Sequence, residues 1–200
     1  MSNETKTVAE LRETLQQLKT DLIDDDNVDY NLFGDALSAL AGIGKSHLIE
    51  FKNEVYELLD FWQEDIRSEA IATLGFDTRL GVSKAEFADK AYEIWKNDPS
   101  DSVKRTALTI WSGYYIRTKD NRVLTELYKI LKDDTFGIGI RTVAYIGVFD
   151  VVKEGYPASY EPFATSTKLL KSANKKEFES KVDWDAIHAI MKKYAPEALE

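Results

Sequence analysis

The sequence predicts an all-α chain in which pairs of helices follow one another as a solenoid. Three observations support this prediction. Short segments recur at a spacing of about 36 residues, apolar residues within them follow a helical period, and no convincing pair of β-strand segments appears. With 200 residues, of which 44% are hydrophobic, the chain can bury a substantial core.

One family of repeated segments marks the ends of first helices. Tyr56, Tyr92 and Tyr128 lie 36 residues apart and begin the runs Tyr-Glu-Leu-Leu, Tyr-Glu-Ile-Trp and Tyr-Lys-Ile-Leu. Each run continues into charged residues. The spacing therefore indicates three copies of one helix end.

A second family of segments marks the second helices. In each, a β-branched residue is followed four positions later by alanine and four positions after that by a large apolar residue, so the three share one helical face. We expect this face to be buried, with the alanine where two helices cross closely. The copies lie 37 residues apart and comprise Ile66, Ala70 and Leu74; Val103, Ala107 and Trp111; and Ile140, Ala144 and Val148.

The repeats divide the chain into helix pairs within a single domain, residues 1–200. A weaker copy around Leu22 and Leu32 precedes the three clear ones. A break at residues 155–162 separates the array from an atypical capping unit, predicted as helices near 163–173 and 184–194. The predicted pairs cover about residues 8–42, 46–76, 84–118 and 121–154.

Helix-start signals agree with this division. Ser83 and Glu86 have the capping-box spacing, in which a hydroxyl and a carboxylate satisfy free backbone amides. Asp98 followed by Pro99 predicts the start of a second helix, because proline at the first helical position loses no hydrogen bond.

The segment DPSDSVKRTAL, residues 98–108, resembles the inter-helix turn and second helix of the HEAT-repeat family. In that family a turn aspartate is followed by valine five residues later, then a basic residue, then alanine, as at Asp98, Val103, Lys104 and Ala107. The runs DIRSEA and GIRTVA match the later part. Near the second run Asp134 lies six residues before the β-branched position, one more than the pattern.

The resemblance covers roughly residues 8–154 and is specific for fold rather than function. It implies a right-handed α-α superhelix, a solenoid of about four to five HEAT-like helix pairs. It also implies a structural ladder in which basic residues of second helices meet turn aspartates of neighbouring repeats. The ladder would comprise Arg67, Asp98, Lys104 and Arg141.

The charge of the chain argues against some classes of partner. It carries 26 basic and 35 acidic residues, a net charge of −9, and residues 1–60 hold 13 acids and 5 bases, a net charge of −8. Nucleic acid and anionic membranes attract the opposite sign, so a basic protein is the favoured partner. The alternative is that the negative charge only maintains solubility.

The composition and the first residues of the chain predict its location and exclude cysteine chemistry. Apolar runs are too short to span a bilayer, and the first residues lack a secretory signal, so we expect a cytoplasmic protein. The absence of cysteine excludes disulfides, thiolate metal sites and cysteine nucleophiles.

Few residues suggest catalytic or metal chemistry. The run from Ala39 to Ser46 satisfies a permissive phosphate-loop pattern, but a helical period precedes it, so a helix end at Gly42 and Gly44 and a new cap at Ser46 fit better. His47 and His188 are the two histidines, and neither has a spaced metal partner. We therefore predict no catalytic residue, no metal site and no cofactor.

The sequence thus predicts a non-enzymatic protein-binding module. Its sharpest version is a cytoplasmic immunity or antitoxin-like inhibitor of a basic toxin. Two alternatives stay open by resemblance: an alkylpurine DNA glycosylase using Trp111 and Asp101, and a HEAT-type bilin lyase or chaperone relative. The acidic turn Asp24-Asp25-Asp26, which lacks the glycine and distal glutamate of a calcium loop, and tyrosines on second helices are the candidate contacts. The partner-binding set is Asp24, Asp25, Asp26, Asp101, Arg105, Tyr114, Tyr115 and Tyr145.

Overall fold

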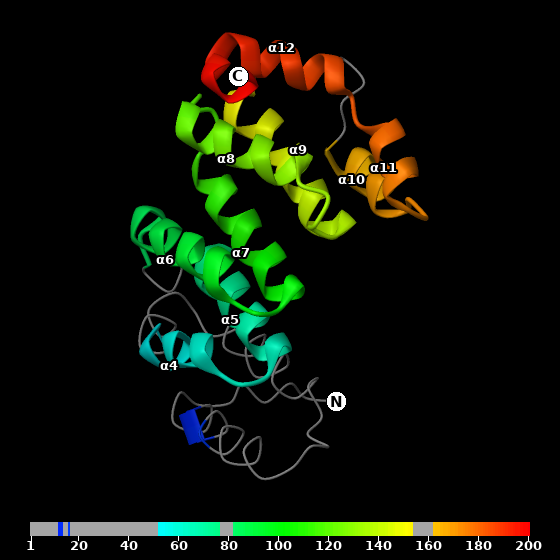
Figure 1. The fold of residues 1–200 in the computed structure, drawn as a ribbon. Helices are drawn as coiled ribbons and strands as arrows, with labels where there is room; N and C mark the ends of the chain where they lie inside the picture. Colours follow the sequence, from blue (N-terminus) through cyan, green and yellow to red (C-terminus); the bar gives the residue numbers. More distant parts are fainter. Residues whose placement is uncertain (1–11, 14–15, 17–51, 77–81, 154–161) are drawn as a thin grey trace, which may run out of the picture. The chain divides into compact units, whose positions relative to one another are not determined.

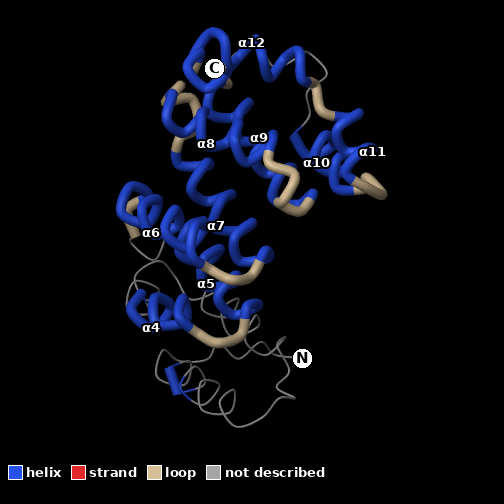
Figure 2. The backbone as a smooth tube through the Cα atoms, in the orientation of Figure 1, coloured by secondary structure: helices blue, strands red, loops and turns tan. Residues whose placement is uncertain are grey.

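The structure is a computed structural model, and it describes residues 12–13, 16, 52–76, 82–153 and 162–200 (Figure 1). Within these ranges the regular elements are helices, and no strand occurs (Figure 2). The predicted all-α class is therefore confirmed for this part of the chain. The chain divides into two compact units, residues 1–87 and 88–200, which are described separately. The single array over residues 1–200 stays a prediction.

The first unit contains a helical hairpin. Helix α4 (Lys52–Glu57) runs into the short 3-10 helix η2 (Leu58–Asp60), and α5 (Glu64–Phe76) follows after a tight turn. Val55, Leu58 and Ile66 are buried in its core. The Arg67 guanidinium donates to the carbonyl oxygens of Phe61 and Trp62, at 2.7 and 2.9 Å, and so holds the turn closed.

Helix α6 (Lys84–Asn97) begins in the first unit and continues into the second. The hydroxyl of Ser83 accepts a hydrogen bond from the backbone N–H of Glu86 at 3.1 Å. This bond satisfies an amide that the first turn leaves without a helical partner. The predicted cap at Ser83 is confirmed.

The second unit is built around one apolar helix. Its further elements are α7 (Asp101–Tyr114), α8 (Asn121–Lys132), α9 (Ile138–Val152), α10 (Pro162–Leu170), α11 (Lys175–Lys181), α12 (Trp184–Tyr194) and η4 (Pro196–Leu199). Helix α9 is apolar over most of its circumference and packs against α7, α8, α10 and α12 (Figure 1). A helix that is hydrophobic all round needs such cover on several sides.

The turn between α7 and α8 is fixed to the end of α9. The backbone N–H groups of Arg117 and Lys119 donate to the carbonyls of Asp150 and Val151, at 3.0 and 3.1 Å. Both donors lie in the left-handed region, with φ of 66° and 58°. The turn thereby satisfies carbonyls that the last turn of α9 leaves unpaired.

The predicted buried face of the second helices is confirmed. The alanines of the three copies are fully buried. The other residues of the repeated face are buried too, and the most exposed of them is Trp111, at 6%. One helix boundary and one whole helix differ from the prediction. Helix α7 begins at Asp101 with Ser100 as its N-cap, because the carboxylate of Asp98 instead accepts from the Ser100 N–H at 2.8 Å. Helix α11 was not predicted.

No helix in the described residues has the length and apolar character required to cross a membrane.

Candidate functional site

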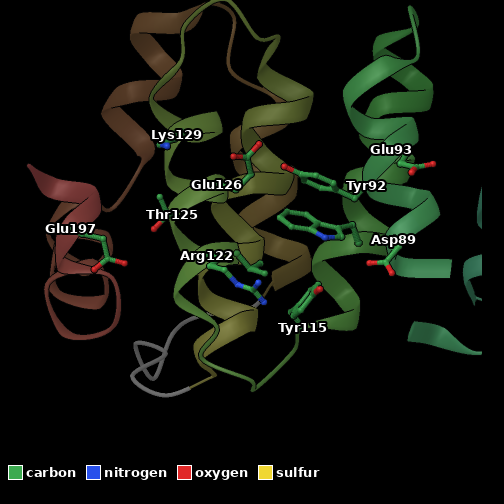
Figure 3. Close-up of a pocket in the computed structure, with 11 residues that line it drawn as sticks. Asp89, Tyr92, Glu93, Tyr115, Arg122, Thr125, Glu126, Lys129 and Glu197 are labelled. Carbon is green, nitrogen blue, oxygen red and sulfur yellow. The ribbon is translucent and has the colours of Figure 1, made fainter. Parts of the chain in front are cut away.

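An open pocket of about 870 Å³ lies in the second unit, between α6 and α8 (Figure 3). We call it the α6–α8 groove. Helix α7 contributes its floor, and η4 contributes one residue from the C-terminal end. The groove is lined by Asp89, Tyr92, Glu93, Trp111, Tyr115, Arg122, Val123, Thr125, Glu126, Lys129 and Glu197.

The floor of the groove is aromatic. The rings of Tyr92 and Trp111 have their centroids 4.9 Å apart with 40° between their planes, and Trp111 and Tyr115 are 5.8 Å apart at 66°. Trp111 stands where the other two copies of the repeat have Leu74 and Val148. Its larger ring extends the buried face of α7 to the groove.

An ion pair beside the groove joins α6 to α8. The ammonium of Lys96 binds the carboxylate of Glu126 and also lies 5.3 Å from the ring centroid of Tyr92. Burial disfavours the charged ammonium, but the hydrogen bond and charge of Glu126 outweigh it, so the pKa of Lys96 is raised. Tyr92 is thus half-buried beneath a cation that the chain itself supplies.

One end of the groove surrounds the hydroxyl of Tyr115. Burial raises the pKa of Tyr115, and the nearby charges of Asp89 and Asp120 raise it further, against a lowering effect of Arg122. Asp120 is also the N-cap of α8 and accepts from the backbone N–H groups of Arg122 and Val123, at 2.9 and 3.2 Å. Two carboxylates and one guanidinium thus act on this hydroxyl.

The charge of the whole lining has the same sign. It carries four carboxylates, Asp89, Glu93, Glu126 and Glu197, against the two bases Arg122 and Lys129, a net charge of −2. Within the described residues, no group of three or more acidic or histidine side chains could hold a metal ion. The lining of the groove therefore combines aromatic ring surface with an excess of carboxylates.

The structure brings some of the predicted partner-binding residues to the groove and leaves others outside it. Tyr115 lines the groove. Tyr114 is 39% exposed, and the centroid of its ring lies 4.9 Å from that of Tyr115. Tyr145 is buried and packs edge-on against Phe149, so its ring belongs to the core. Asp24, Asp25 and Asp26 lie outside the described residues, as do Gly42 to Ser46 and His47.

Asp101 and Arg105 are exposed on α7 but lie near the start of α9 rather than in the groove. A carboxylate oxygen of Asp101 is 3.6 Å from the position that a Cβ atom on Gly137 would take. The Cδ atom of Arg105 is 3.4 Å from the corresponding position at Gly139. Asp101 thus places negative charge at a helix N-terminus, where it is stabilising.

The predicted ladder residues bind mainly the backbone. Arg141 donates from Nε to the carbonyl of Leu131 at 2.8 Å, forms an ion pair with Glu179 and lies over the ring of Phe178. Like Arg67, it thereby binds a backbone carbonyl that precedes its own helix, but Arg67 binds the turn after η2 whereas Arg141 binds the end of α8. Lys104 is half-buried, and Asp98 shapes the turn before α7. The ladder of aspartates that the resemblance implied stays a prediction.

Comparisons with protein-family models, with curated proteins and with solved structures found no match to this chain. Sequence reasoning missed Asp89, Tyr92 and Arg122 as site residues. One available signal was Trp111, because a tryptophan replaces an aliphatic residue at a repeated position.

Proposed function

We propose that this chain is a non-enzymatic protein-binding module and that the α6–α8 groove is its binding site. The observation that carries the proposal is a groove of about 870 Å³ with an aromatic floor and an excess of carboxylates. Aromatic side chains provide contact area at low entropic cost, and opposite charge accelerates association with a basic partner.

The proposed scaffold is a HEAT-like solenoid, a right-handed superhelix of helix pairs. Two features support it. The positions spaced by 37 residues are buried alike in α5, α7 and α9, and Arg67 and Arg141 both donate to backbone carbonyls that precede their own helix. Repeat scaffolds of this kind offer extended surfaces to other macromolecules.

The partner that the charge favours is a basic protein, with inhibition of a basic toxin in the cytoplasm as the specific version. The net charge of −9 and the net charge of −2 along the groove support this choice. The glycosylase alternative requires Trp111 and Asp101 in one cleft. Trp111 lines the groove whereas Asp101 does not, so the site gives that alternative no support.

The experiment that tests the proposal identifies a partner through the groove. A photo-reactive amino acid at Thr125, in the full-length chain, should crosslink to one partner in the source cells, and mass spectrometry would identify it. The purified partner is then titrated by calorimetry against the wild type and against Glu93→Lys. Reversing this one rim charge should weaken binding about fivefold or more. It should also make the affinity depend less on salt concentration than the affinity of the wild type does.

The matched control is Glu69→Lys, the same charge reversal at an exposed site of α5 outside the groove. It should bind the partner as the wild type does. The proposal would be contradicted if the wild type and Glu93→Lys bound the partner with equal affinity. It would also be contradicted if the partner were acidic and its affinity did not change with ionic strength.

A further inference from the structure

The Tyr115 end of the groove brings three rings and one carboxylate together. Tyr92, Trp111 and Tyr115 form a continuous series of ring contacts, and the charge of Asp89 acts on the hydroxyl of Tyr115. In Figure 3 Asp89 and Tyr115 lie at the same end of the groove. We call these four residues the aromatic box.

Rings arranged in this way attract cations. The face of an aromatic ring carries partial negative charge and holds an ammonium or guanidinium within about 6 Å of its centroid. The chain itself already uses this property at Tyr92, where the ammonium of Lys96 lies 5.3 Å from the centroid. Tyr115, which is half-buried, supplies further ring surface beside it, the mostly buried Trp111 ring packs behind both tyrosines, and Asp89 supplies a counter-charge.

The chain also places a guanidinium of its own at the mouth of the box. Arg122 reaches toward Tyr115 in Figure 3. Its side chain is 85% exposed and contacts Asp120 at a nitrogen–oxygen distance of 3.4 Å. So exposed a side chain is held weakly and is able to move aside for an incoming cation.

We propose that the aromatic box binds an arginine side chain of the partner. This inference rests on the proposed function and specifies the chemistry that the groove recognises. The planar guanidinium stacks on the rings and donates hydrogen bonds to the carboxylate of Asp89, a pairing that lysine reproduces less well. Arg122 competes with the incoming guanidinium by charge repulsion.

The opposite assignment would make Arg122 and Lys129 the anchors of an anionic group. The two assignments predict opposite effects for the same substitutions. If a cation binds, removing the charge of Asp89 weakens binding and removing the charge of Arg122 strengthens it. If an anion binds, both effects change sign.

The probe is the peptide (Gly-Arg)3 with acetylated and amidated ends, titrated into the full-length chain at physiological ionic strength. Binding is followed by NMR through the indole N–H signal of Trp111, which is assigned by its loss in Trp111→Phe. The same peptide with citrulline in place of arginine keeps the shape without the charge. It should bind about tenfold or more weakly, and the lysine peptide about threefold more weakly.

Two variants then test the site. Asp89→Asn should weaken binding of the arginine peptide about fivefold, and Arg122→Gln should tighten it about threefold. Glu69→Gln, outside the groove, should leave it unchanged. Citrulline binding as well as arginine, lysine binding as well as arginine, or either variant changing affinity in the opposite direction would overturn the proposal.

Failure of the arginine proposal can be distinguished from failure of the proposed function. If the arginine peptide does not bind while Glu93→Lys still weakens the natural partner, the groove is a binding site but not for arginine. If the partner binds Glu93→Lys as well as the wild type, the proposed function fails whatever the peptide does. Circular dichroism and unchanged thermal unfolding of each variant would show that it is folded.

Discussion

The two helix pairs of the second unit, α6–α7 and α8–α9, use the same sequence pattern for different purposes. Tyr92 in α6 and Tyr128 in α8 occupy equivalent positions, and each has a lysine four residues later whose ammonium lies over the ring, at 5.3 and 5.1 Å. Tyr128 is nevertheless buried, whereas Tyr92 is half-buried and lines the groove. A local motif therefore does not decide whether a side chain serves the core or a site.

The difference comes from what packs on each tyrosine. Helix α12 packs against α8 and α9, and its His188 meets the ring of Tyr128 with centroids 6.2 Å apart. Tyr92 instead faces Trp111 across the groove floor. The capping helix of the chain thus converts one copy of the motif into core, and the groove lies where the other copy stays open.

The largest expected effect follows from this contrast. Tyr128→Ala should lower the free energy of unfolding by about 3 kcal/mol, as removal of a buried aromatic ring does, and Tyr92→Ala by about 1 kcal/mol because water already reaches its ring. Urea unfolding followed by circular dichroism measures both. Equal losses would mean that the two positions are packed alike. Only Tyr92→Ala should also weaken binding of the arginine peptide.

The next effect compares the basic residues of the second helices. Arg141 in α9 is fully buried between Leu131, Phe178 and Glu179, whereas its equivalent Lys104 in α7 is half-buried. Arg141→Leu should cost about 2 kcal/mol, because the carbonyl of Leu131 loses its donor and Glu179 its partner. Lys104→Leu should change stability by less than about 0.5 kcal/mol. The same urea titrations test the pair, and a large loss for Lys104→Leu would contradict the difference in burial.

The helical class and the buried faces of the helix pairs could be predicted from the sequence because they depend on local periodicity. The alanines at the helix crossings are buried as their pattern indicates. The start of α7 was misplaced by the Asp98-Pro99 signal, because Ser100 and Asp98 compete to bind free backbone amides and a short pattern does not say which one caps the helix. Helix α11 is only seven residues long, too short to show a period.

The candidate site was harder to predict than the fold. Tyr145 shares its residue type and predicted helix face with Tyr115, yet it is buried and Tyr115 lines the groove. Asp89 and Arg122 come from first helices and meet Trp111 only through the tertiary arrangement. Spacing along the chain identifies a helix face, but whether that face is covered depends on helices far away in sequence.

A smaller effect concerns the cap of α8. Asp120→Ala should cost about 1 kcal/mol at neutral pH, because two backbone N–H groups lose their acceptor. Burial works against the carboxylate, but the hydrogen bonds from Val123 and Arg122 outweigh it and lower the pKa of Asp120. The contribution of its charge is therefore complete above the pKa of the unfolded chain, about 4, and is lost as the pH falls through the lower value of the folded chain.

Asp120→Asn is the matched variant, since asparagine caps helices about as well but carries no charge. Its stability should be close to that of the wild type at pH 7. Urea unfolding between neutral and strongly acidic pH should show the difference between the wild type and Asp120→Ala shrinking below about pH 4. A difference that persists unchanged at the acidic end would show that the charge of Asp120 contributes nothing.

The smallest expected effect concerns the N-terminus of α9, compared with the N-terminus of α8. Helix α8 has a side-chain cap, whereas α9 begins at Gly137, which has none. A Cβ atom there would lie 3.6 Å from the carboxylate of Asp101, an ordinary contact, so Gly137→Ser should fit and stabilise the chain by a few tenths of a kcal/mol. Gly137→Asp should gain less, because its charge meets that of Asp101, and should recover the gain in the Asp101→Asn background. Thermal unfolding of the five chains, the wild type, the three single variants and the double variant, measures the series. An equal gain for serine and aspartate beside an intact Asp101 would show that this carboxylate does not act on the start of α9.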